Sequence, residues 1–262
     1  MSSDSAAKDL PQVLVFGGTC ETHELAARLL ALSCRVTMSV ASDYGRSVLP
    51  PDSERFSVLS GPMLPDAIRT RLASGAYVCV IDATHPYATS VSAHVAQAAE
   101  QTQVPYLRLA RDPSDLTGCT VVDDMAAAAA LVAQSSGPVL LTTGVKDLDV
   151  FAQHVPDFAE RLYPRILPTV SSITRATGLG YQLSHLIAMQ GPFSQELNVA
   201  LIHQIGATTL VTKDGGAQGG FAPKVKAAQE CGCPVIVIKR PEDLPGLEMD
   251  ALLAQVEQLL EG

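Results

Sequence analysis

Short, wholly apolar runs recur along the chain, and each is followed by glycine or small polar residues and then by a helix-like segment. Because a strand that is covered on both faces needs apolar residues at consecutive positions, unbroken runs are typical of parallel sheets packed between helices. The alternation therefore predicts an α/β fold, doubly wound from βαβ units into mainly parallel sheets. The apolar runs cover residues 13–16, 78–81, 139–141, 186–189, 210–211 (with two threonines directly before them) and 235–238. The helix-like segments cover residues 21–32, 89–101, 125–134, 194–204, 220–230 and 249–260.

The alternation is interrupted at residues 111–124, a stretch that carries proline, aspartate and glycine. Each side of the interruption is long enough to form a domain with its own core. We predict a Rossmann-like nucleotide-binding domain at residues 1–113 and a second α/β domain at residues 114–262. Ligands of open α/β sheets gather at the carboxyl ends of the strands. We therefore expect a ligand cleft between the two domains, lined by the residues that follow the apolar runs.

Composition narrows the classes of function. The chain has 18 Lys and Arg against 27 Asp and Glu, a net charge of −9, and no basic cluster, which disfavours nucleic acid as a partner. The first ten residues are polar and no run reaches the ~20 apolar residues of a membrane helix, so we expect a cytoplasmic protein without a membrane partner. Six scattered cysteines form no CxxC pair, and no residues have metal-ligand spacing, so we expect no metal. The sequence is compatible with a monomer.

The first apolar run ends in Gly17, Gly18 and Thr19, directly before a predicted helix. Glycines at such a turn let backbone N–H groups approach a phosphate at the positive end of the helix. The segment lacks the third glycine and the spacing of the full dinucleotide fingerprint, so a plain tight turn is the alternative. We predict that these residues hold the pyrophosphate of a nucleotide.

The run at residues 78–81 ends in a segment that contains Asp82, Thr84, His85 and Tyr87. A carboxylate, a hydroxyl, an imidazole and a phenol so close together favour a functional turn. The alternative is a helix cap made by the Asp and the Thr, with an incidental His and Tyr.

Two later runs end in lysine-containing polar turns, residues 142–147 and 212–216. A lysine at the end of a buried strand suits a carboxylate or a phosphate. The alternative is a lysine that pairs with the adjacent aspartate at the rim of the sheet. Between these turns, Gln190 ends a further strand, and Ser194 is placed to cap the next helix.

Six segments in this order resemble the precorrin-6A reductase and cobalt-precorrin-6A reductase family: residues 13–19, 82–88, 104–109, 142–147, 188–194 and 210–216. The similarity extends from about residue 11 to residue 240. It implies an oxidoreductase of cobalamin biosynthesis that uses NADPH or NADH to reduce one double bond of the tetrapyrrole precorrin-6A, or of its cobalt form, to precorrin-6B. The alternative is a Rossmann-like nucleotide-sensing module without catalysis, which would not need polar turns in its second domain.

The implied reaction assigns a role to each polar turn. Reduction of a carbon–carbon double bond needs a proton as well as a hydride, and the candidates for delivering that proton are His85, Tyr87 and Lys213. For the cofactor we predict contacts from Gly17, Gly18, Thr19, Ser42, Asp43, Thr84, Thr143 and Gly144. For the carboxylate-bearing substrate we predict contacts from Arg108, Arg111, Lys146, Gln190, Ser194, Asp214, Gly215 and Gly216, with Arg165 as a further cation.

The end of the predicted strand at residues 36–40 bears on the choice of cofactor. In Rossmann sites an acidic residue there binds the ribose hydroxyls of NAD, whereas Arg or hydroxyl groups accommodate the extra phosphate of NADP. Asp43 favours NADH because it would repel that phosphate, but Ser42 and Arg46 are able to bind it. The resemblance implies NADPH, so both NADH and NADPH remain candidates. We expect Asp43 to be the residue that decides between them.

Overall fold

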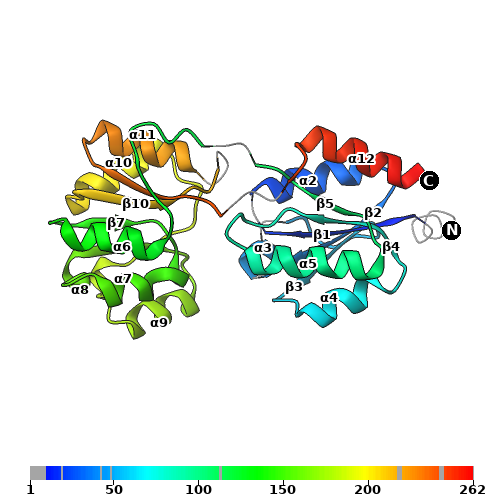
Figure 1. Ribbon diagram of the computed structural model, residues 1–262, viewed down its shortest axis with the longest axis horizontal. Coiled ribbons are helices and arrows are strands. Elements are labelled where there is room, and N and C mark those ends of the chain that lie inside the picture. The colour runs from blue at the N-terminus through cyan, green and yellow to red at the C-terminus, as the bar shows by residue number, and fades with distance from the viewer. Residues whose placement is uncertain are drawn as a thin grey trace. The chain divides into compact units, whose positions relative to one another are not determined.

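The computed structural model describes residues 10–18, 20–41, 43–47, 49–111, 114–216, 220–241 and 245–261, apart from the side chains of Cys20, Asp43 and Tyr44. These residues form two compact units (Figure 1). The first contains the described residues up to Arg111 together with those from Pro241 onward. The second contains the described residues from Ser114 to Arg240.

The first unit is built on a five-stranded sheet in the order β3-β2-β1-β4-β5, and all of its strands are parallel. This is the strand order of a Rossmann-like doubly wound fold. The strands are β1 (Gln12–Gly17), β2 (Arg35–Val40), β3 (Phe56–Ser60), β4 (Tyr77–Asp82) and β5 (Tyr106–Arg108). The helices are α2 (Cys20–Ala31), the short α3 (Asp43–Ser47), α4 (Pro65–Leu72), α5 (Thr89–Thr102) and α12 (Met249–Glu261).

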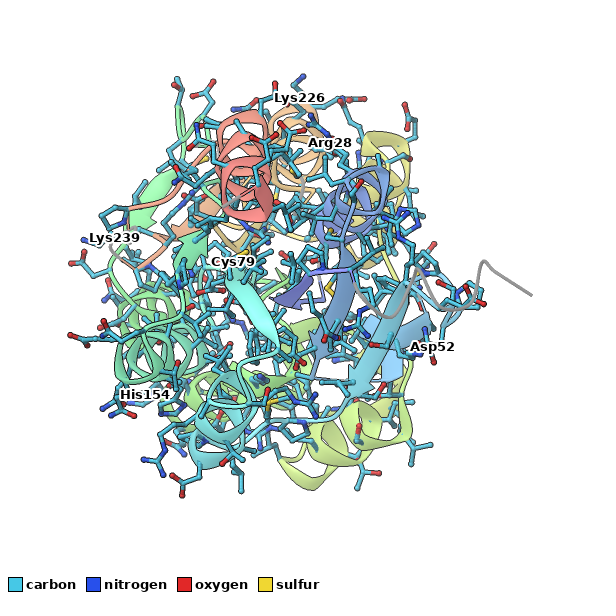
Figure 2. The ribbon with its side chains drawn as sticks, turned by 90° about the vertical axis from the view of Figure 1, so that its right-hand side faces the viewer. Arg28, Asp52, Cys79, His154, Lys226 and Lys239 are labelled. Carbon is cyan, nitrogen blue, oxygen red and sulfur yellow. The ribbon has the colours of Figure 1, made fainter. Side chains whose placement is uncertain are left out.

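Helices cover both faces of this sheet, as Figure 1 shows, with α2 and α12 on one face and α4 and α5 on the other. Side chains alternate along β1 between the two layers. Val13 and Val15 pack toward α2 and α12, whereas Leu14 and Phe16 pack toward α4 and α5. Cys79 on β4 lies fully buried within the sheet (Figure 2). The predicted apolar run is therefore a strand that is buried on both sides.

Helix α12 corrects the predicted domain boundary. The sequence placed residues 249–260 in the second domain, but Leu252, Leu253 and Val256 pack into the core of the first sheet. The chain returns beside β5, where the N–H of Ala110 donates to the carbonyl of Leu247 over 2.8 Å. The helix is amphipathic, and an apolar stripe shows that a helix is covered without showing which sheet covers it.

The second unit contains a six-stranded parallel sheet in the order β6-β11-β10-β7-β8-β9. Its strands are β6 (Thr120–Val122), β7 (Val139–Leu141), β8 (Leu162–Ile166), β9 (Ile187–Ala188), β10 (Thr209–Lys213) and β11 (Val235–Ile238). Its α-helices are α6 (Met125–Gln134), α7 (Leu148–His154), α8 (Phe158–Arg161), α9 (Val170–Gly178), α10 (Gln195–Ile205) and α11 (Phe221–Glu230).

This sheet is also covered on both faces, by α10 and α11 on one side and by α6 and α7 on the other (Figure 1). Ile202 of α10 and Phe221 of α11 share a core with Leu140 of β7 and Leu210 of β10. Of the helices that the structure describes, none is long and apolar enough to cross a membrane.

We expect Leu252→Ala to lower the free energy of unfolding by about 2–5 kcal/mol, because the substitution leaves a cavity in the core of the first unit. Urea unfolding of the full chain measures the change. Gln255→Ala, on the exposed side of the same helix, is the matched control and should change stability by less than about 0.5 kcal/mol. If the two substitutions lowered the free energy of unfolding equally, the packing of Leu252 would not be what stabilises α12 on the first sheet.

Candidate functional site

The order of strands in the first sheet reverses between β1 and β4, because β2 and β3 lie on one side of this pair and β5 lies on the other. In doubly wound folds the ligand binds at this switch point, outside the carboxyl ends of the strands. Strand β1 ends in the turn formed by Gly17 and Gly18, and β4 ends in Asp82. Both predicted polar segments of the first domain therefore meet at the position where such a fold binds its ligand.

The structure requires the two glycines for different reasons. A Cβ on Gly17 would overlap the side chain of Thr22, which is fully buried. Gly18 has φ +126°, a conformation that L-residues rarely adopt. Its N–H donates to Oγ1 of Thr22 over 3.1 Å. The side chain of Thr22 therefore holds the turn from within, and Thr19 lies outside the described residues.

Helix α3 approaches this turn closely. A Cβ on Gly45 would lie 3.6 Å from the Cα of Gly18 and 3.0 Å from the Cβ of Val40. The segment after β2 is thus packed against the glycine turn, as a site for the adenosine half of a dinucleotide requires. Ser42 and the side chain of Asp43 lie outside the described residues. Arg46 donates to the carbonyl of Pro50 over 2.9 Å and pairs with Asp52 over 3.2 Å.

Asp82 is the centre of a buried hydrogen-bond network at the end of β4. Its Oδ1 accepts from the N–H and the hydroxyl of Thr84, over 3.0 and 2.7 Å. Its Oδ2 accepts from the Tyr106 hydroxyl over 2.9 Å and pairs with the guanidinium of Arg108. Arg108 also donates to the Ser92 hydroxyl over 2.9 Å. The structure therefore gathers Thr84 and Arg108, which were predicted as ligand contacts, around a carboxylate of the protein itself.

The network holds Asp82 in its charged form. Burial would raise the pKa of this carboxyl, but hydrogen bonds from Thr84 and the positive charge of Arg108 outweigh burial and lower the pKa. Burial and the adjacent Asp82 charge raise the pKa of Tyr106, so its hydroxyl stays a donor. A second ion pair of this unit joins Arg111 to Glu21 at the start of α2, over 2.7 Å, with both side chains 8% exposed.

His85 and Tyr87 lie side by side after β4, both half-buried, with ring centroids 5.5 Å apart. Nδ1 of His85 accepts from the backbone N–H of Tyr87 over 3.3 Å. A neutral imidazole whose Nδ1 accepts carries its proton on Nε2. The turn thus presents a histidine with a defined tautomer and a phenol next to it.

The second sheet has its own switch point, between β7 and β10, where the strand order reverses. Lys213 at the end of β10 pairs with Asp147 after β7 over 2.5 Å. Oγ1 of Thr143 is buried and has no hydrogen-bond partner among the described residues. Beside it, Gly144 has φ +86°, and a Cβ there would meet no atom within 4 Å. An orphaned hydroxyl next to open space is what a ligand-binding turn provides.

The other predicted contacts of this unit have varied surroundings. Asp214 accepts from Ser114 over 2.5 Å, from Arg240 over 2.9 Å and from the Gly216 N–H over 3.2 Å, so it stabilises its own turn, which includes Gly215. Burial would raise the pKa of Asp214, but the bonds from Arg240 and Ser114 lower it. The remaining three are the exposed Lys146, the exposed Gln190 and Ser194, whose hydroxyl caps α10 by accepting from the Leu197 N–H over 3.3 Å.

Two buried cations lie at the carboxyl edge of this sheet, and sequence reasoning noticed only one of them. Arg165 on β8 is 6% exposed and Lys224 on α11 is 9% exposed. Lys224 was missed because it falls within an ordinary amphipathic pattern, and only the packing of α11 shows that it points inward. Across the described residues, no three His, Cys, Asp or Glu side chains gather as a metal site would require.

The strand order of the first unit, the glycine turn at its switch point and the polar carboxyl edges define the class: a two-unit, Rossmann-like α/β protein of the ligand-binding kind. A solved structure titled CobK precorrin-6A reductase has this fold, with a TM-score of 0.78 and 24% identity over 95% of this chain and 98% of that chain. The family model described as precorrin-6x reductase CbiJ/CobK matches residues 12–261, and the chain belongs to this family of reductases.

Curated relatives agree with the family. The cobalt-precorrin-6A reductase of Salmonella typhimurium is 35% identical over 93% of this chain and 94% of its own length. The enzyme of the same name from Priestia megaterium is 31% identical over 88% and 91%. The precorrin-6A reductase of Mycobacterium tuberculosis is 31% identical over 88% and 90%. The resemblance inferred from six short segments is therefore confirmed over nearly the whole chain.

The Asp82 network predicts a pH-dependent contribution to stability. Asp82→Asn keeps the shape of the side chain but leaves Arg108 buried without its counter-charge, so we expect the free energy of unfolding near neutral pH to fall by about 3–5 kcal/mol. The pKa of Asp82 is lower in the folded than in the unfolded chain. Its contribution is therefore complete above the unfolded pKa of about 3.9 and is lost as the pH falls through the folded pKa.

Urea unfolding of wild type and variant over a series of pH values measures this effect. The difference between the two proteins should narrow below about pH 4. Asp66→Asn is the control, because Asp66 pairs with Arg69 on the surface and should contribute little at any pH. If the free energies of unfolding of wild type and Asp82→Asn differ by the same amount down to acid pH, the charge does not reside on Asp82 as assigned.

Proposed function

We propose that the protein reduces one carbon–carbon double bond of precorrin-6A, or of its cobalt form, with a nicotinamide nucleotide as hydride donor. The observation that carries the proposal is the family match over residues 12–261, supported by relatives with that activity in their names that align over most of their length. A nucleotide-sensing module without catalysis is not favoured, because the similarity to reductases includes the polar turns of both units.

The residues at the first switch point fit a nicotinamide nucleotide. Gly17 and Gly18 form a tight turn between a buried strand and a helix, and a Cβ on Gly18 would meet nothing closer than 3.9 Å, so the side of the turn is open to a phosphate. When bound, the cofactor supplies the hydride, and the protein supplies alignment and electrostatics. We assign the pyrophosphate to this turn, with Thr19 as a further contact, and propose Thr143 and Gly144 as contacts from the second unit.

The second hydrogen of the reduction is a proton, and we propose three side chains as candidates to deliver it. Nε2 of His85 is a donor in the neutral tautomer, and the Tyr87 hydroxyl adjoins it. The ammonium of Lys213 is held at the end of β10 by its ion pair with Asp147.

For the carboxylate-bearing substrate, we propose some residues as direct contacts and others as supporting residues. Arg108 is paired with Asp82 and Arg111 with Glu21. We therefore propose that these two arginines contribute to the electrostatic potential at the sheet edge and do not bind a substrate carboxylate by themselves. Lys146 is exposed and is proposed as a direct cationic contact. The other proposed contacts are Gln190, Ser194, Asp214, Gly215 and Gly216.

The proposed reaction is tested by anaerobic turnover of precorrin-6A and of its cobalt form, side by side, with NADPH and with NADH. We expect oxidation of the nicotinamide in step with reduction of the macrocycle for at least one substrate. Both names occur among the relatives, so the assay also decides which form of the substrate this protein prefers. Absence of nicotinamide oxidation with either substrate would refute the proposal.

Asp43 is proposed to decide the choice of cofactor, because α3 begins at this residue and packs beside the glycine turn. Removing the carboxylate in Asp43→Ser removes its repulsion of a 2′-phosphate. We expect the ratio of kcat/KM for NADPH to that for NADH to rise by roughly tenfold, the equivalent of about 1.4 kcal/mol. Glu100→Ser, at the far end of α5, is the control. An unchanged ratio in Asp43→Ser would show that Asp43 does not contact the ribose.

A further inference from the structure

Two cations are buried at the carboxyl edge of the second sheet. Arg165 is the last residue but one of β8, and Lys224 lies in the first turn of α11. The positive charge of Arg165 acts on Lys224, because it lowers the pKa of that lysine in addition to the larger effect of burial. The two side chains therefore share one electrostatic environment.

The partners of this pair are neutral. Nη1 of Arg165 donates to Oδ1 of Asn198 on α10 over 2.8 Å, and its guanidinium lies 4.0 Å from the ring centroid of Phe193. Nδ2 of Asn198 is itself used, since it donates to the carbonyl of Ser194 over 2.7 Å. Within the described part of the chain, neither cation has a carboxylate partner, and Lys224 has no hydrogen-bond partner.

Such an arrangement is unfavourable in the protein alone. Burial lowers the pKa of Arg165 to about 10 and that of Lys224 to about 7, which reflects the cost of two desolvated like charges. The other buried arginines at the sheet edges are neutralised by Asp82, Glu21 and Asp214. Unfavourable features of this kind cluster at ligand-binding sites, where a bound anion supplies the missing counter-charge.

We propose that Arg165 and Lys224, positioned by Asn198 and Phe193, form a binding site for a carboxylate of the tetrapyrrole substrate. This inference rests on the proposed function for the identity of the ligand. Planar, bidentate donation by Arg together with a point charge from Lys suits a carboxylate group. A carboxylate is favoured over the cofactor pyrophosphate because we have already assigned the pyrophosphate to the glycine turn of the first unit.

Lys224→Met tests the site, because Met replaces the lysine stem and removes the charge. Lys226→Met is the matched control: Lys226 lies two residues further along α11, is exposed, and points away from the protein body in Figure 2. Lys224→Gln serves as a second variant that keeps hydrogen-bonding capacity without the charge. The first readout is the melting temperature in sodium propionate compared with sodium chloride at equal ionic strength.

We expect propionate to raise the melting temperature of wild type and Lys226→Met, and to have no such effect on Lys224→Met or Lys224→Gln. Without any ligand, Lys224→Met should melt at a higher temperature than wild type, because it lacks a buried unpaired cation. In turnover, the KM for the tetrapyrrole should rise between about tenfold and a hundredfold in Lys224→Met, with the KM for the nicotinamide unchanged.

The site is refuted if propionate acts equally on wild type and Lys224→Met, or has no effect on wild type. A rise in the KM for the nicotinamide instead of the tetrapyrrole would overturn the substrate assignment in favour of a cofactor phosphate. A lower melting temperature of ligand-free Lys224→Met would show that Lys224 stabilises the fold itself and would contradict the proposal. If wild type reduces neither form of precorrin-6A, the proposed function fails, while the propionate measurement still decides whether the anion site exists.

Discussion

Both sheets are parallel and are covered by helices on both faces, and this constraint determines where the protein can do chemistry. Consecutive positions in such strands must be apolar, as Val13 to Phe16 in β1 are. Polar side chains are then confined to the ends of the strands, where the backbone turns toward a helix. The polar residues after β1, β4, β7 and β10 gather at the two switch points for this reason.

The charges buried at these edges fall into two groups. Asp82 with Arg108, Glu21 with Arg111 and Asp214 with Arg240 are ion pairs within the protein, and they fix the turns in which they lie. Arg165 and Lys224 are held by a neutral amide and an aromatic ring instead. The first group is complete without a ligand, whereas the second has charge left to neutralise. That difference distinguishes residues that shape the edge from residues that are able to bind an anion.

Sequence patterns predicted much of the fold, because the apolar runs became β1, β4, β7, β9, β10 and β11. Strands β3, β5, β6 and β8 were not foreseen. β3 and β6 carry exposed or half-buried residues, and β8 contains Pro164 and Arg165 within its five residues. The patterns also identified the helix at residues 249–260, but placed it in the second domain. Its contacts with the first sheet involve residues far apart in sequence, and local periodicity contains no information about them.

The sequence by itself determined the fold class, the glycine turn at Gly17 and Gly18, and the family, because these depend on short segments whose residues are neighbours along the chain. The tertiary structure decided which polar residues pair with one another. It joined Arg108 to Asp82, 26 residues apart, and Lys213 to Asp147, 66 residues apart. It also turned Lys224 inward against the sheet. The energy of a buried charge depends on the partners that packing brings to it, and those partners come from other strands and helices.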